Sequence, residues 1–182
     1  DTAVMDGQSL HLDDAGFDVS ASIVGVIFFP DIVKGISELR RVLRPGGRCA
    51  VVCWGDPLKF EMFGFLRRAI EQAMPDFAMP DETPVWARMS GEAALRDYMQ
   101  RGGFADPVIE SFTCSHRIAS IADYWTRFIG ASPPMQSMLG SIGEDAMRDM
   151  GEAFIELVRK DTGTDSPVFS AEACIAIGHR DC

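Results

Sequence analysis

The sequence lacks the long apolar runs of a membrane protein and the positive charge of a typical nucleic-acid-binding protein. In 182 residues the longest apolar stretch runs from Ile23 to Pro30, whereas a membrane-spanning helix needs roughly 18 consecutive apolar residues. The formal net charge is −10, so the overall field would repel a phosphate backbone. We therefore expect no membrane span and no nucleic acid partner.

Cysteines are few and show no metal-binding spacing. No Cys-x-x-Cys pair occurs, and Cys49 and Cys53 lie in an apolar run where a free thiol behaves as a small hydrophobic group. We expect neither a metal site nor a disulfide framework, and the reducing cytoplasm as the location. The five cysteines are Cys49, Cys53, Cys114, Cys174 and Cys182.

The sequence also lacks an initiator Met, and its first residues have neither the basic nor the apolar region of a signal peptide. This start favours a processed or truncated chain. At 182 residues the chain is nevertheless long enough for one domain with a sizeable core.

What the sequence does contain is a strand–helix–strand pattern. Phe17–Ile23 is predicted as a strand, and Asp31 as the cap of a helix with apolar residues at helical spacing. The run Arg44-Pro45-Gly46-Gly47 is expected to stop that helix. Arg48–Trp54 is then a nearly continuous apolar strand, which is typical of a sheet covered by helices on both faces.

The rest of the chain is predicted to alternate between helices and strands. Ser90 is expected to cap the helix at 90–101, and Gly102-Gly103-Phe104 to end it. A methionine-rich stripe in the last helix is interpreted as core. The predicted elements are helices at 60–74, 90–101, 121–129 and 135–160, and strands at 107–117 and 168–177.

Several segments resemble class I S-adenosylmethionine-dependent methyltransferases, and most closely the ubiquinone/menaquinone-biosynthesis type. The most specific is Arg41-Val42-Leu43-Arg44-Pro45-Gly46-Gly47-Arg48 after the strand at 17–23. Asp6-Gly7-Gln8-Ser9-Leu10 resembles the acidic turn after that family's third strand, and Gly102-Gly103-Phe104 a late helix-to-strand junction. The resemblance covers residues 1 to about 117.

The resemblance implies an α/β fold, namely the C-terminal part of a Rossmann-like methyltransferase sheet with helical insertions. Residues 1–54 and 90–117 would form the sheet framework of one partial domain spanning 1–182, with 166–182 as the final strand. Segments 55–89 and 118–165 would be substrate-side insertions. The family's strand order, 3-2-1-4-5-7-6, would leave the strand at 17–23 at an open edge, where another chain could pair or swap to give a homodimer.

The resemblance also implies S-adenosyl-L-methionine as cofactor. Ligands of open α/β sheets bind at the carboxyl ends of the strands, where Asp6 could accept a hydrogen bond from the adenine amine. Gly7 would leave space for the ring, and Phe28 could cover the methyl group. For each residue the alternative is a turn or packing role. The expected cofactor contacts are Asp6, Gly7, Ser22, Ile23, Val24, Gly25 and Phe28.

One departure from the family is large. Its glycine-rich loop follows the first strand, yet only five residues precede Asp6. We expect about a hundred further residues upstream in the intact protein, and weak or no cofactor binding by this chain alone.

Aromatic residues in the segments added to the sheet could line an apolar pocket for a small, apolar or aromatic methyl acceptor. Core packing is an equally good interpretation of them. No catalytic residue is identified, since His11, His116 and His179 have no partner at a catalytic spacing. The expected pocket residues are Trp54, Phe60, Phe63, Trp86 and Trp125.

Two other functions stay open. A nicotinamide-dependent oxidoreductase shares the sheet, but neither Tyr98 nor Tyr124 has a lysine at the short-chain spacing. A non-catalytic dimerising or binding module with a methyltransferase-like fold is the main alternative, since fold alone does not fix a reaction.

Overall fold

A computed structural model describes residues 2–77, 87–129 and 142–181 of the chain. Two compact units are present. The first comprises residues 1–57, 82–113 and 172–182, and the second comprises residues 58–81 and 114–171. Strands β3 and β4 contribute residues to both units. The assignment of 55–89 and 118–165 as substrate-side insertions stays a prediction.

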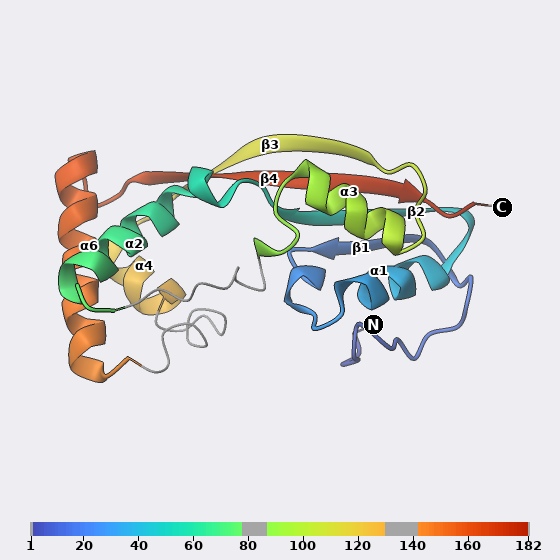
Figure 1. Cartoon of the computed structure of the whole chain (residues 1–182), viewed down its shortest axis with the longest axis horizontal. Coiled ribbons are helices and arrows are strands. Elements are labelled where there is room, and N and C mark those ends of the chain that lie inside the picture. Colours follow the sequence, from blue (N-terminus) through green and yellow to red (C-terminus); the bar gives the residue numbers. More distant parts are fainter. Residues whose placement is uncertain (1, 78–86, 130–141, 182) are drawn as a thin grey trace. The chain divides into compact units, whose positions relative to one another are not determined.

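The described strands form one mixed sheet in the order β1-β2-β4-β3 (Figure 1). β1 is parallel to β2, whereas β4 runs antiparallel to β2. If these are the fourth to seventh strands of the expected fold, the observed order is 4-5-7-6, as that fold requires. The predicted α/β fold class is confirmed. The strands are β1 (Phe17–Ile23), β2 (Leu43–Trp54), β3 (Val108–Arg117) and β4 (Val168–His179).

The first unit packs two helices, α1 (Ile32–Arg41) and α3 (Glu92–Arg101), on the sheet (Figure 1). Alternate β2 residues Cys49, Val51 and Cys53 are fully buried in this core. Their neighbours Ala50 and Val52, which point to the other face, are only half-buried. The prediction of helices on both faces is therefore met on one face of the described sheet.

The predicted cap of α1 is confirmed, but the predicted stop is not where the helix ends. Asp31 Oδ1 accepts from the backbone N–H of Lys34 at 2.9 Å. The helix ends at Arg41, before the Arg44–Gly47 run. That run lies in β2 as an irregularity in its pairing with β1, where Gly46 takes a φ of +79°. Glycine suits this position because it adopts positive φ without a steric penalty.

The prediction for the start of α3 is wrong, and the prediction for its end is confirmed. Gly91, with a φ of +85°, is the N-cap, and the predicted cap Ser90 lies one residue earlier with its buried hydroxyl unbonded among the described residues. At the other end Gly102 is the C-cap and Gly103 takes a φ of +101°. The predicted helix-to-strand junction is confirmed.

The second unit is built from helices around an aromatic core. α2 spans Glu61–Ala73, α4 spans Ile121–Tyr124 with a π-helical turn at Trp125–Ile129, and α6 spans Glu144–Thr162. α6 was expected to start at residue 135. Ile142 and Gly143 precede it, and Met138 and Leu139 lie outside the described residues. Later residues of the stripe confirm the core interpretation, since Met150 and Phe154 are fully buried.

None of the helices in the described part of the chain has the length and apolarity of a membrane span.

Candidate functional site

The candidate site lies in the first unit, at the carboxyl ends of the parallel strands β1 and β2. β1 ends at Ile23, so Val24 and Gly25 belong to the turn after the strand and not to the strand itself. This turn is strained, because Val24 has a φ of +52°, a left-handed conformation that is rare for a β-branched residue. Such strain is retained where the surroundings over-determine it, and it is enriched at functional sites.

Two hydrogen bonds hold the strained turn. The N–H of Val24 donates to the carbonyl of Val52 on β2 at 3.0 Å. The N–H of Val26 donates to the Ser22 hydroxyl at 3.0 Å. Gly25 has a negative φ of −103°, so it is Val24 that carries the left-handed conformation. A Cβ at Gly25 would lie 2.9 Å from the Ser22 hydroxyl, which explains why glycine fits here.

The Asp6 turn is a compact anionic feature. Asp6 Oδ1 accepts from the backbone N–H of Gln8 at 2.9 Å and from the Gln8 side chain at 3.3 Å. The backbone N–H of Gln8, and after it the Gln8 side chain, lower the pKa of Asp6. The exposed carboxylate is therefore ionised at neutral pH. Among the described residues nothing donates to its second oxygen, Oδ2.

The structure brings the Asp6 turn against the segment that follows β1. Gln8 Oε1 accepts from the N–H of Asp31 at 2.9 Å. A Cβ built on Gly7 would lie 2.2 Å from the ring of Phe29. Gly7 thus has a clear packing role, whereas its expected contact with a cofactor stays a prediction.

Helix α1 fixes the segment after the Asp6 turn through Glu38 and Arg41. Glu38 Oε2 accepts from the N–H of Leu10 at 2.8 Å. Arg41 donates to the carbonyls of Leu10 and Leu12, and pairs with Asp14 and Glu38. Hydrogen bonds from Arg41 lower the pKa of Glu38, and Glu38 in turn raises that of Arg41. These bonds make the approach to β1 a fixed segment.

The remaining predicted cofactor contacts, Ile23 and Phe28, are exposed, with 76% and 42% of their surfaces accessible. Both flank the strained turn, since Ile23 ends β1 and Phe28 ends the short 3-10 turn Val26–Phe28. All seven predicted contacts therefore lie in the first unit, on two segments that touch each other.

The expected substrate pocket is not brought together in the same way. Trp54, at the carboxyl end of β2, packs against the core of the first unit. Phe60, Phe63 and Trp125 pack against the core of the second unit. The rings of Phe60 and Phe63 lie 4.6 Å apart in an edge-to-face contact. Trp86 lies outside the described residues.

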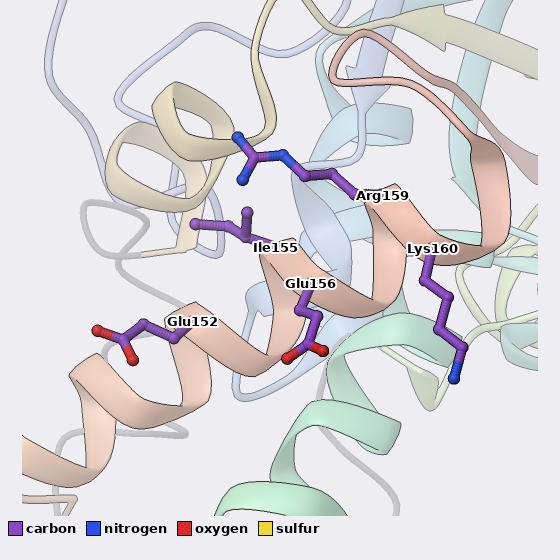
Figure 2. A pocket seen from close by; sticks show the side chains of 5 residues that line it. All are labelled: Glu152, Ile155, Glu156, Arg159 and Lys160. Atoms are coloured by element: carbon purple, nitrogen blue, oxygen red, sulfur yellow. The ribbon is translucent and has the colours of Figure 1, made fainter.

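Two open surface hollows lie in the second unit, and none of the predicted residues lines either. Figure 2 shows that the five lining side chains of one hollow, Glu152 and Ile155 among them, all come from α6. The other contains His116 and Tyr124. Burial raises the pKa of the Tyr124 phenol to about 12.

Comparisons with known proteins agree with the fold. Residues 1–51 match the family model described as a methyltransferase domain. A solved protein from Anaeromyxobacter dehalogenans, provisionally described as a type II methyltransferase, superposes with a TM-score of 0.59 at 20% identity. The match covers 98% of this chain and 71% of that one. A provisionally assigned methyltransferase from Bacillus halodurans gives a TM-score of 0.54 at 15% identity, covering 98% and 76%.

The chain resembles the class I methyltransferases, in its fold over nearly its whole length and in its sequence over residues 1–51. S-adenosylmethionine is the cofactor of that enzyme class, and the predicted family resemblance is confirmed. These likenesses do not favour the alternative of a non-catalytic binding module. The homodimer or domain swap through β1 stays a prediction, although Val19 and Ile23 of that strand are exposed.

Curated relatives match shorter stretches. A demethylmenaquinone methyltransferase from Shouchella clausii is 28% identical over 115 residues, which are 58% of this chain and 49% of that protein. An uncharacterised protein of Mycobacterium tuberculosis is 45% identical over 47 residues, which are 26% of this chain and 17% of that protein. The chain thus spans half or less of the length of these relatives.

Three residues at the candidate site were missed by the sequence interpretation. Phe29 and Gln8 join the Asp6 turn to the loop after β1, and Arg41 orders the segment between them. For Arg41 a signal existed, because Glu38 and Arg41 are spaced as an i,i+3 pair on a predicted helix. No local pattern marks Phe29 or Gln8.

Proposed function

We propose that the complete protein containing this chain transfers the methyl group of S-adenosylmethionine to a small, apolar or aromatic acceptor. The carrying observation is the strained turn at Val24, at the carboxyl end of the parallel strand β1, together with the ionised Asp6 turn, which contacts Phe29 and Asp31 in the loop after that strand. Ligands of open α/β sheets bind at that edge. The bound cofactor supplies the methyl group for an in-line displacement, so the protein mainly contributes alignment.

The residues of this edge fit an adenosyl group. Asp6 Oδ2 offers an acceptor for an exocyclic amine, because only Oδ1 is used by Gln8. The turn at Val24 presents backbone atoms, and the exposed ring of Phe28 presents an apolar surface next to it. Ser22 holds this turn through Val26 and thereby acts indirectly.

The acceptor is proposed to bind near Trp54, which follows β2 at the same edge of the sheet. Gly55 and Asp56 after it are fixed by Glu172 of β4, whose carbonyl accepts from Gly55 at 2.7 Å and whose carboxylate accepts from Asp56 at 3.1 Å. Trp54 therefore stands on a fixed backbone. An indole there favours a flat or apolar acceptor.

Calorimetry of the complete gene product with S-adenosylhomocysteine tests the cofactor site. Asp6→Ala removes a charged acceptor and should weaken binding by about tenfold or more. Asp13→Ala is the matched control, because Asp13 is also an exposed acidic residue of the same segment. The proposal fails if the wild-type protein shows no binding, or if both variants weaken it equally.

Turnover measurements with Trp54→Ala test the acceptor site. Loss of the indole should raise the acceptor KM or lower kcat while the affinity for S-adenosylhomocysteine changes little, although lost packing against the core of the first unit also lowers the thermal midpoint. A large fall in the midpoint with unchanged kinetics would assign Trp54 to core packing alone.

A further inference from the structure

The ring of Phe29 is pressed against the backbone of two glycines from separate segments. A Cβ on Gly7 would lie 2.2 Å from Cζ of the ring, and a Cβ on Gly35 would lie 2.4 Å from Cδ2. Real Cβ atoms do not approach other atoms this closely. The tip of the ring thus touches the Asp6 turn, while one edge touches helix α1.

The ring has little freedom to move away from either glycine. Phe29 is half-buried and packs against the core of the first unit, and interiors of this kind are close-packed. Its own N–H donates to the carbonyl of Val26 at 3.0 Å. The ring is therefore held by the loop that follows β1.

Hydrogen bonds beside the ring link the same segments. Gln8 accepts from the N–H of Asp31, and Asp31 accepts from the N–H of Lys34 in the first turn of α1. Gln8 also donates to Asp6. Ring contact and hydrogen bonds together connect Asp6 to α1 and to the loop after β1.

We propose that Phe29 is a positioning residue, which sets the place of the Asp6 carboxylate relative to the turn at Val24. Gly7 and Gly35 are its necessary partners, because any side chain at either position would displace the ring. This inference rests on the proposed function, since it assigns Phe29 to the cofactor side of that site. Phe29 acts through Asp6 and is not itself a catalytic residue.

The test replaces the ring in the complete gene product. Phe29→Leu removes the contact with Gly7 and should raise the Kd for S-adenosylhomocysteine by about tenfold, because small displacements of a binding group are costly. The acceptor KM should stay about the same, and amide exchange at Gln8 should become faster. Phe112→Leu is the control, since Phe112 is an exposed ring on β3.

Gly7→Ala tests the contact from the other side. Alone it should raise the same Kd about as much as Phe29→Leu, since its methyl group displaces the ring. In the Phe29→Leu background it should add little, because residues in direct contact give non-additive effects. Gly35→Ala pushes the ring from α1 and tests the proposal independently if Phe29→Leu fails to fold.

The outcomes separate this proposal from the one on which it rests. A wild-type protein that does not bind S-adenosylhomocysteine overturns both. A wild-type protein that binds, with variants that lose thermal stability but keep its Kd, overturns the positioning role alone. Fully additive effects of Gly7→Ala and Phe29→Leu on the Kd would also overturn it.

Discussion

The two units of the molecule hold their interiors together in different ways. In the first unit, backbone and side chains meet at glycines, as where a Cβ on Gly102 would lie 2.3 Å from Ile36 or one on Gly178 would lie 2.6 Å from Phe104. In the second unit, aromatic side chains fill the core, such as Trp125 against Phe154 at 5.4 Å between ring centroids. Among the described residues of that unit, Gly151 beside Trp125 is the one comparable close approach.

This difference teaches what each unit tolerates. The first unit should be sensitive to added volume, because several of its glycines, among them Gly7, Gly35 and Gly102, leave no room for a methyl group. The second should be sensitive to lost volume, because large rings make up its core. The methyltransferase-domain match at residues 1–51 falls within the first unit.

The largest expected effect is a cavity in the second unit. Phe154 is fully buried, so Phe154→Ala should lower the free energy of unfolding by about 3–5 kcal/mol. Denaturant unfolding measures this, with amide exchange in α6 as the local readout. The exposed Phe112→Ala is the control, and equal losses for both variants would contradict the comparison.

The second-largest effect should come from added side-chain volume in the first unit. Gly102 has a negative φ of −76°, so Gly102→Ala carries no backbone penalty and isolates the clash with Ile36. Overpacking of this kind costs about 1–3 kcal/mol. Gly64→Ala within α2 is the matched control, because nothing lies near its Cβ position and alanine favours a helix by about 0.5–1 kcal/mol. Gly102→Ala should lower the free energy of unfolding and Gly64→Ala should raise it, as denaturant unfolding measures. A change of the same sign for both variants would refute the steric explanation.

A smaller effect should appear in the acid range through Glu38. Hydrogen bonds from Arg41 lower the pKa of Glu38 in the folded state. Its stabilisation is thus complete above the unfolded pKa of about 4.3 and is lost as the pH falls through the lower folded value. Glu38→Gln should lower the free energy of unfolding by less than about 1 kcal/mol at neutral pH. It should also make the stability depend less on pH in the acid range. Thermal midpoints from pH 3 to 7, with the exposed Glu110→Gln as control, measure this.

The smallest effect concerns thiol reactivity and leaves stability unchanged. Burial raises the pKa of Cys53, in the first unit, to about 12. Cys114, in the second unit, is only half-buried. An aromatic disulfide reagent should therefore label Cys114 long before Cys53, since the thiolate is the reactive form. Peptide mapping at short times decides it, and earlier labelling of Cys53 would contradict its buried position.

The sequence predicted the elements of the first unit well, because each left a local signal. Asp31 caps α1 as expected, and β1 has the predicted bounds of Phe17 and Ile23. Errors arose where glycine chemistry has two solutions. Gly46 serves a strand irregularity and not a helix end, and Gly91 caps α3 in place of Ser90.

The site was predictable only in part. Spacing placed Asp6 and the residues after β1 at one edge of the sheet, yet nothing in a linear pattern shows that the ring of Phe29 lies against Gly7. That contact depends on tertiary packing between segments about twenty residues apart. The sequence interpretation grouped the aromatic residues Trp54, Phe60 and Trp125 in one pocket, whereas in the structure they pack against two different cores.

The position of β4 between β2 and β3 sets an order of assembly during synthesis. β2 can already pair with β1, but neither β2 nor β3 can pair with β4 until residues 168–179 have been made. The guanidinium of Arg180 then donates to the carbonyls of Arg41 and Leu43. The last carbonyl of α1 is therefore bonded by a residue that is synthesised long after the helix. Sheets that depend on such distant pairing form slowly. The nascent chain thus carries an open β2 edge until residues 168–179 follow, and a chaperone would have its best access to that edge during this interval.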